Sequence, residues 1–232
     1  MLANQTPIVN KLLAALPPKE YQHLVTDLEP VELTLGDILY EPGELIRHIY
    51  FPSDCLVSLL AVAEQHMALE VGLVGKEGVV GIVVALGGRI SPVRAIVQRS
   101  GMVTRIKLES FEREMSKSPF LRHELYGYSH ALMVQATQIA ACSRFHTLEA
   151  RLVRSLLMTS DRLQAEEFHL THEFLASTLG VRRVGVTKAA SALQQRKLIR
   201  YSRGEIKILD RKGLEAASCH CYQIIKDICC NV

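Results

Sequence analysis

Residues 168–210 read FHLTHEFLASTLGVRRVGVTKAASALQQRKLIRYSRGEIKILD, and this stretch decides how the chain is interpreted. Thr171 is suited to cap a short helix whose apolar stripe ends at Gly180, a residue that permits a sharp turn. A second helix is predicted from Arg182, with small residues on its inner side. Two short strands about a turn at Gly204 are predicted to follow. Helix, turn, helix and hairpin in this order indicate a winged helix-turn-helix.

Positive charge gathers on the second half of this stretch. Positions 182 to 212 hold ten basic and two acidic residues, a balance suited to a polyanion. A short cationic helix held by a partner helix is what the major groove of DNA admits. We therefore predict DNA binding rather than a merely solvated basic domain. The predicted DNA contacts are Arg182, Arg183, Val184, Thr187 and Lys188 on the helix and Arg203 at the hairpin tip.

The composition is that of an ordinary globular chain with one large or two modest domains. Of its 232 residues, 48% are hydrophobic and 22% are charged. The net charge of +3 is divided unevenly, because residues 146–232 hold 14 basic and 9 acidic residues. No apolar run approaches the length of a membrane span, and the N-terminus does not resemble a signal peptide. We therefore expect a cytoplasmic protein with no membrane partner.

Short stretches of β character alternate with turn residues from about position 31 to position 107. Strands this short and this regularly interrupted predict a small barrel or jelly roll. One or two short helices are expected before it, between positions 7 and 29. The predicted strands are 31–35, 38–40, 48–51, 56–62, 68–73, 94–98 and 103–107.

A long helix is predicted from about position 119 to position 145, and another at 148–163. Along the long helix, a seam that begins at position 121 alternates spacings of four and three residues. We predict that it forms a parallel two-helix contact between two copies of the chain, since a protein with one recognition helix usually needs two half-sites. Packing on the chain's own barrel is the alternative. The predicted dimer contacts are Leu121, Leu125, Tyr128, Leu132 and Ile139.

Three short motifs at the start of the roll and one long motif in the opening stretch carry a family resemblance. They are Leu-Gly-Asp at 35–37, Glu-Pro-Gly at 41–43, Tyr-Phe at 50–51 and LASTLGVRRVGVT at 175–187. On these motifs the whole chain resembles the Crp/Fnr family of bacterial transcription regulators. The resemblance implies an α+β fold with a cyclic-nucleotide-binding-like β-roll at 1–117, a dimerisation helix at 118–145 and a winged helix-turn-helix at 146–232. It also implies a homodimer that binds a palindromic operator on double-stranded DNA, with RNA polymerase as a further partner.

The predicted effector pocket departs from the cyclic-AMP-responsive members of that family. Those members hold the ribose with a glutamate and the cyclic phosphate with an arginine. Ile82, which follows Gly81, stands in the place of the glutamate. In one alignment Arg94 lies one position away from that of the phosphate-binding arginine, on the wrong face of its strand. Arg89 is a further cation in the loop. With these four residues as pocket candidates, we expect another small-molecule effector, a protein partner or no effector, rather than cyclic AMP.

The recognition helix departs from the family as well. Arg183 and Lys188 match its basic positions, but Val184 replaces a glutamate that accepts a hydrogen bond from cytosine, and Arg182 replaces a serine cap. Valine contacts a thymine methyl group but accepts no hydrogen bond. The half-site is therefore predicted to differ at the base pair that the glutamate would read.

The six cysteines are a poor basis for a disulfide framework, and reduced thiols are expected. The run Cys219-His220-Cys221 could bind a soft metal or become oxidised. Its Cys-x-Cys spacing is tighter than the zinc-binding Cys-x-x-Cys, so we expect these residues to pack a last helix, with no metal or cofactor. Four cysteines lie in the last 14 residues: Cys219, Cys221, Cys229 and Cys230.

No catalytic constellation stands out, so an enzyme is the least supported class. We find no nucleophile with a base, no paired carboxylates and no phosphate-binding loop. The competing class is a small-molecule, thiol or metal sensor module that acts through protein partners and binds DNA only non-specifically. Loss of DNA binding at modest salt would distinguish that module from a sequence-specific regulator.

Overall fold

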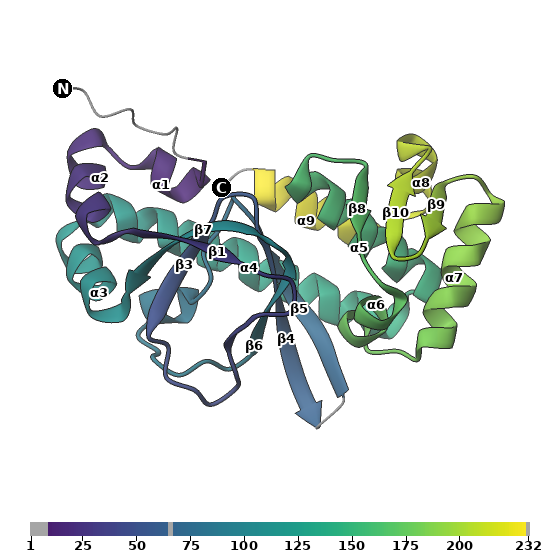
Figure 1. The fold of residues 1–232 in the computed structure, drawn as a ribbon, viewed down its shortest axis with the longest axis horizontal. Coiled ribbons are helices and arrows are strands. Elements are labelled where there is room, and N and C mark those ends of the chain that lie inside the picture. Colours follow the sequence, from purple (N-terminus) through teal and green to yellow (C-terminus); the bar gives the residue numbers. More distant parts are fainter. Residues whose placement is uncertain (1–8, 65–66, 231–232) are drawn as a thin grey trace.

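The computed structural model describes residues 9–64 and 67–230. Two sheets of β strands build the half that holds the N-terminus, while helices and a small sheet build the other half (Figure 1). Helices α4 (Pro119–Phe145) and α5 (Leu148–Leu163) run between the two halves. This is the predicted α+β fold. None of the described helices combines the length and the apolar character that a membrane span requires.

The roll consists of two antiparallel sheets whose strands lie within two residues of the predicted bounds. The three-stranded sheet has the order β1 (Glu29–Leu33), β7 (Gly101–Lys107) and β3 (His48–Pro52). The four-stranded sheet has the order β2 (Ile38–Tyr40), β6 (Arg94–Arg99), β4 (Leu56–Glu64) and β5 (Met67–Val74). Alternating side chains from both sheets fill the space between them, as in a jelly roll.

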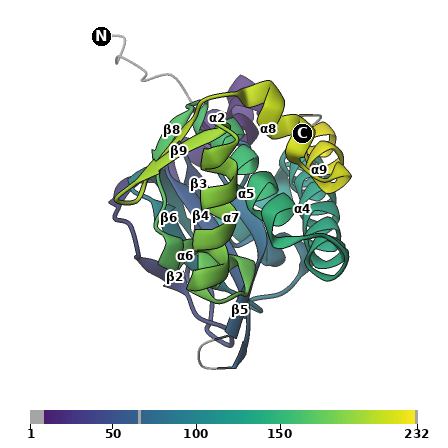
Figure 2. The same cartoon turned by 90° about the vertical axis from the view of Figure 1, so that its right-hand side faces the viewer.

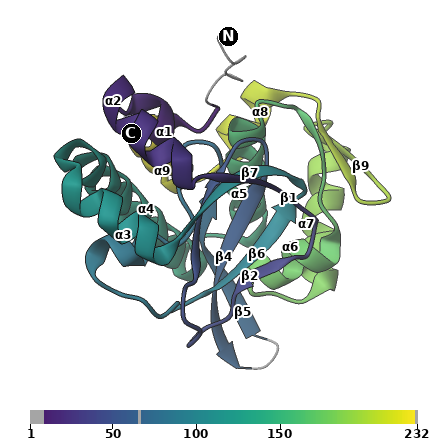
Figure 3. The same cartoon turned by 60° about the vertical axis from the view of Figure 1, so that its left-hand side comes forward.

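Short helices close one side of the roll. Figure 3 shows α1 and α2 on the same side as α3 and α4. Phe51 of the roll and Phe111 of α3 are fully buried, with ring centroids 6.4 Å apart. The short helices are α1 (Lys11–Ala15), α2 (Pro18–Leu24), the 3-10 turns η1 (Val25–Asp27) and η2 (Ile82–Leu86), and α3 (Leu108–Lys117).

Helix α4 packs its predicted seam against its own chain. Leu121, Leu125 and Tyr128 belong to the core of the roll, and Ile139 joins the core of the C-terminal half. Leu132 is half-buried against the roll. Burial of Leu121, Leu125, Tyr128 and Ile139 within their own chain favours the alternative, in which the seam packs on its own chain. An apolar seam shows that a helix needs a partner, without showing which surface provides it.

The C-terminal half contains the predicted helix-turn-helix and hairpin, together with a strand that was not predicted. β8 pairs with β10 and turns the two-stranded hairpin into a three-stranded antiparallel sheet of order β8-β10-β9. The expected last helix is divided in two at Ser218. The elements are β8 (Glu167–His169), α6 (His172–Leu179), α7 (Arg183–Gln195), β9 (Ile199–Ser202), β10 (Glu205–Ile208), α8 (Arg211–Ala217) and α9 (His220–Cys230).

A buried ion pair joins the two halves. Arg162 of α5 donates from Nε to Glu77 Oε1 at 2.8 Å, and the two side chains are only 7% and 9% exposed. Arg162 also donates to Gln135 Oε1 of α4 at 2.9 Å and to Cys229 Sγ of α9 at 3.7 Å. Glu77 in turn accepts from the Gly75 amide at 3.1 Å. One guanidinium therefore fixes the loop after β5 against three helices.

Candidate nucleic-acid interface and roll pocket

The surface that we call the reader consists of α6, α7 and the sheet β8-β10-β9. Thr171 Oγ1 accepts from the Phe174 amide at 3.1 Å, so the predicted cap of α6 is confirmed. Gly180 ends α6 with a φ of 64°, in the left-handed region. A Cβ at this position would lie 3.2 Å from the carbonyl oxygen of Ala68 in β5. The turn between the two helices therefore also rests against the roll.

The outer face of α7 carries the predicted DNA contacts. Arg182 occupies the N-cap position, and Arg183, Thr187 and Lys188 are exposed on the first two turns. Val184 is 59% exposed beside these polar side chains. The inner face buries Val186, Ala189, Ala190 and Leu193, and Figure 2 shows α7 on the outside of this half. The structure thus brings five of the six predicted contacts to one end of one exposed helix.

The cations at this end of α7 are nearly free of ion pairs. Among the described residues, Arg182 and Lys188 have no carboxylate oxygen within 4.0 Å. Arg183 approaches Glu173 only at 3.9 Å, and both side chains are largely exposed. Such an exposed pair contributes about 0–1 kcal/mol. Their charge is therefore available to a polyanion.

Thr187 is oriented by a histidine that the sequence did not single out. The Thr187 hydroxyl donates to the Arg183 carbonyl oxygen at 3.1 Å, so His172 Nδ1 is the donor in its 3.0 Å hydrogen bond with Thr187 Oγ1. The His172 ring stacks on Tyr201 of β9, with centroids 3.9 Å apart. Burial and the Arg183 charge lower the pKa of His172. These contacts tie α6, α7 and the hairpin together, and no local sequence pattern signals them.

Arg203 lies at the tip of the β9–β10 hairpin, as predicted. It is exposed and takes a left-handed φ of 52°, which is uncommon for a residue with a side chain. Gly204 follows with a φ of 89°, and a Cβ there would lie 2.5 Å from the His169 ring of β8. The unpredicted third strand therefore supports the turn that presents Arg203.

A cavity of about 220 Å³ lies between the roll and α4. Gly81 and Ile82 line it, as predicted, with Ile82 opening the 3-10 turn η2. None of the described residues along its wall is charged. They are Tyr40, Ile46, Leu59, Val71, Gly81, Ile82, Val83, Leu86, Ser91, Pro92, Val93, Ser129, Leu132, Met133 and Ala136.

The candidates Arg89 and Arg94 do not line this cavity. Arg89 Nη2 pairs with Glu112 at 2.7 Å, and Arg94 Nε pairs with Glu41 at 2.9 Å. In the sheet, Ala95 stands opposite both Tyr40 and Leu59, two residues of the cavity wall. Because side chains alternate along β6, Arg94 points to the other face.

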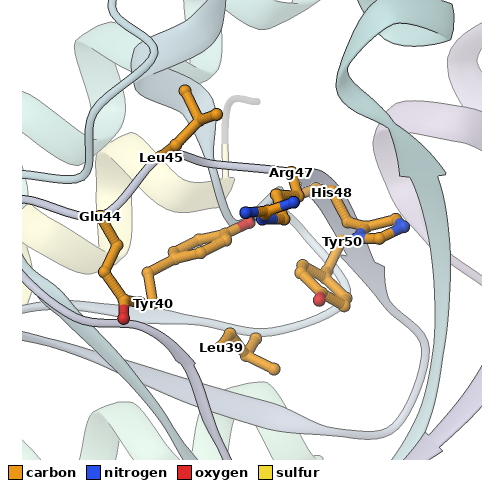
Figure 4. Close-up of a pocket in the computed structure, with 7 residues that line it drawn as sticks. All are labelled: Leu39, Tyr40, Glu44, Leu45, Arg47, His48 and Tyr50. Atoms are coloured by element: carbon orange, nitrogen blue, oxygen red, sulfur yellow. Dashed lines mark hydrogen bonds between the residues drawn. The ribbon is translucent and has the colours of Figure 1, made fainter.

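A second hollow, of about 300 Å³, lies at the turn between β2 and β3. In the view of Figure 4, Glu44 lies on one side of the Tyr40 ring, and Arg47 and His48 lie near the Tyr40 hydroxyl. That hydroxyl donates to the His48 carbonyl oxygen, and burial raises the pKa of Tyr40. Tyr40 is thus a neutral structural donor shared by the two hollows. The residues that line this second hollow are Leu39, Tyr40, Glu44, Leu45, Arg47, His48 and Tyr50.

A comparison with protein families matches residues 150–217 to the Crp-like helix-turn-helix domain. These residues run from α5 to the end of α8 and contain the whole reader. Residues 150–217 therefore form a helix-turn-helix domain of the Crp-like family, and the chain as a whole has the fold of Crp/Fnr transcription regulators.

Solved structures support the Crp/Fnr fold of the whole chain. FixK2 from Bradyrhizobium japonicum superposes with a TM-score of 0.72 at 16% identity, covering 83% of this chain and 98% of that one. A proposed Crp/Fnr regulator from Eubacterium rectale gives 0.70 at 17% identity, over 89% and 97% of the two chains. A Crp/Fnr regulator from Thermus thermophilus gives 0.57 at 25% identity, over 82% and 98%. The Eubacterium rectale and Thermus thermophilus proteins are named as Crp/Fnr transcription regulators rather than as enzymes, as predicted for this chain. A comparison with curated protein sequences finds no match.

Proposed function

We propose that the protein is a homodimeric transcription regulator that recognises a specific palindromic DNA operator. The observation that carries this proposal is the exposed, nearly unpaired positive charge at the N-terminal end of α7. Arg183 and Lys188 would contact base edges or phosphates in the major groove, with Arg182 anchoring the first turn. Arg203 would grip the sugar-phosphate backbone from the wing. Bound DNA would bring the dimer beside RNA polymerase or exclude the polymerase from a promoter.

For the dimer we propose the outer face of α4, in place of the buried seam. Along this face, exposed side chains recur with alternate spacings of four and three residues, which is the pattern of a two-helix contact. Tyr126 is 51% exposed and Met133 is 61% exposed, and a second copy of the chain would cover both. Such a dimer presents two α7 helices to half-sites about 34 Å apart. The face consists of Tyr126, His130, Met133, Thr137, Ala140 and Arg144.

The effector, on this proposal, is a small uncharged molecule in the cavity between the roll and α4. A cyclic phosphate placed there would meet no guanidinium among the described lining residues, and a ribose would meet Ile82 in place of a carboxylate. Buried polar groups without partners cost about 1–3 kcal/mol each. These costs argue against cyclic AMP.

A selection from random DNA duplexes by the purified full chain tests the proposed function. We expect enrichment of a palindrome at a salt concentration of about 0.15 M. The enriched half-site should differ from the cyclic-AMP-receptor consensus where Val184 stands. A parallel selection with a metabolite extract would show whether a small molecule changes the affinity.

Two outcomes would contradict this proposal in different ways. Weak binding without sequence preference, lost at modest salt, would favour the sensor module that acts through protein partners. Recovery of the unmodified consensus would leave the regulator in place but overturn the role given to Val184.

A further inference from the structure

Four side chains able to bind a metal meet beside the junction of α4 and α5. Cys142 lies in the last turn of α4 and His146 directly follows that helix, while Cys219 precedes α9 and Cys221 lies in its first turn. Their four ligand atoms all lie within 4.8 Å of one another. The sequence showed only the Cys-x-Cys pair, because Cys142 lies 77 residues from Cys219.

Two of the six separations between these atoms are close to the edges of a zinc tetrahedron. With Zn–S bonds of about 2.3 Å and Zn–N bonds of about 2.0–2.1 Å, neighbouring ligand atoms stand about 3.5–3.8 Å apart. Cys142 Sγ lies 3.4 Å from Cys219 Sγ, and Cys221 Sγ lies 3.7 Å from His146 Nδ1. A sulfur separation of this size is far from the roughly 2.05 Å of a disulfide.

We propose that Cys142, His146, Cys219 and Cys221 hold one zinc ion through three thiolates and one imidazole. Four protein ligands leave no open coordination position, as in structural zinc sites. The three thiols are buried and His146 is exposed, so the ion would enter past the histidine. The thiolates select a soft or borderline cation over magnesium or calcium.

A buried arginine next to the cluster supports a negatively charged complex there. Zinc with three thiolates carries one net negative charge. Arg154 is 3% exposed, makes no ion pair within 4.0 Å among the described residues, and has an Nε without a hydrogen-bond partner. Its contact with Met158 Sδ, at 3.6 Å, is weak. A buried, poorly paired guanidinium is costly, and a neighbouring anionic complex would offset that cost.

The Arg154 charge interacts electrostatically with Cys142 and with Cys221. Arg154 also acts on Glu70, a buried carboxyl of β5 whose pKa is raised by burial. Binding of zinc would replace the thiol protons and leave the arginine facing the complex.

The ion would join the end of the long helix to the last helix of the reader half. Figure 2 shows α9 alongside α4. Tyr222 and Ile225 of α9 are buried in the core that also holds the inner face of α7. Cys229 belongs to the Arg162 contact instead, and the side chain of Cys230 lies outside the described part of the structure. The zinc site stands independently of the proposed DNA binding, since metal content is measured without DNA.

The metal content of the full chain tests this proposal directly. The protein is purified without a histidine tag under reducing conditions and dialysed against metal-free buffer. We expect one equivalent of zinc per chain. After exchange for cobalt, we expect the intense d–d bands of tetrahedral Co²⁺ and a thiolate-to-cobalt charge-transfer band. Reduced, folded protein that retains no zinc and develops neither set of bands would overturn the proposal.

Single substitutions locate the site. Cys219→Ser, Cys221→Ser and His146→Ala should weaken zinc binding by more than the roughly 10- to 100-fold typical for loss of a residue that only orients a ligand. The matched controls are His220→Ala, which removes the exposed histidine between the two cysteines, and Cys55→Ala, which removes a buried cysteine of the roll. Both should keep full binding. Zinc binding that survives Cys219→Ser but not His220→Ala would place the metal elsewhere and refute the four-residue site.

Discussion

Three arginines of the roll differ from two arginines of the reader in their partners. In the roll, Arg89, Arg94 and Arg105 each meet a carboxylate of their own domain at 2.7–3.1 Å. In the reader, Arg182 and Arg203 have no such partner among the described residues. A charge that is already neutralised offers little to an anionic ligand, whereas an exposed, unpaired charge is ready for one. The number of cations in a region is therefore a poorer guide to its ligand than the partners of each cation.

The largest effect that we predict concerns Arg162, the buried arginine whose ion pair joins the two halves. Arg162→Met should lower the free energy of unfolding by about 3–5 kcal/mol, because it leaves Glu77 as a buried carboxylate without its partner. Urea unfolding of the full chain would measure this loss.

The matched control is Arg105→Met, which breaks an exposed pair and should cost about 0–1 kcal/mol. The double substitution Glu77→Gln with Arg162→Met should recover part of the loss. Equal costs for Arg162→Met and Arg105→Met would show that burial does not distinguish these two pairs.

A smaller effect is expected for an unpaired cation of the reader. Arg183→Ala should weaken operator binding by about 1–3 kcal/mol and relax specificity at one base pair, with no comparable loss of stability. Titration of an operator and its single-base variants would measure both effects. Arg105→Ala makes the same change of charge in the roll and should leave DNA binding nearly unchanged. If Arg183→Ala distinguishes operator variants as well as the parent does, the side chain reads no base.

The smallest effect is expected where a roll arginine is released from its pair. Glu41→Gln frees Arg94 and should change the free energy of unfolding by only about 0.2–1 kcal/mol, because both side chains are about one third exposed. Calorimetry should still detect no cyclic AMP binding, since Arg94 lies on the face of β6 away from the cavity. Cyclic AMP binding by this variant, but not by Glu112→Gln, would show that the ion pair with Glu41 alone prevents Arg94 from binding the cyclic phosphate.

Local signals in the sequence predicted most of the secondary structure. Thr171 and Gly180 define α6 through contacts within four residues, and the turn residues of the roll separate its strands. β8 escaped prediction because it has only three residues, of which Phe168 alone is buried. The apolar seam of α4 follows the predicted spacing, but a period of hydrophobic residues carries no information about the surface that covers it.

The candidate sites also differ in whether their contacts lie within one continuous stretch of chain. The reader could be predicted because its contacts lie on one helix and one turn of continuous chain. The structure places Ile82 at the cavity. Arg89 and Arg94 instead pair with carboxylates that lie 23 and 53 residues away in the sequence, and spacing could not predict these partners. The meeting of Cys142 with Cys219 is non-local in the same way. Neighbours that only the fold creates cannot be inferred from spacing.

The bare backbone of Gly180 has a consequence for the geometry between sensor and reader. A Cβ at this position would lie 3.2 Å from the Ala68 carbonyl oxygen of the roll, which is tighter than most Cβ contacts. A side chain at position 180 would require a shift of a few tenths of an ångström at this contact and would strain the left-handed backbone of the turn. The close contact between the reader and the roll at this corner thus depends on a residue without a side chain.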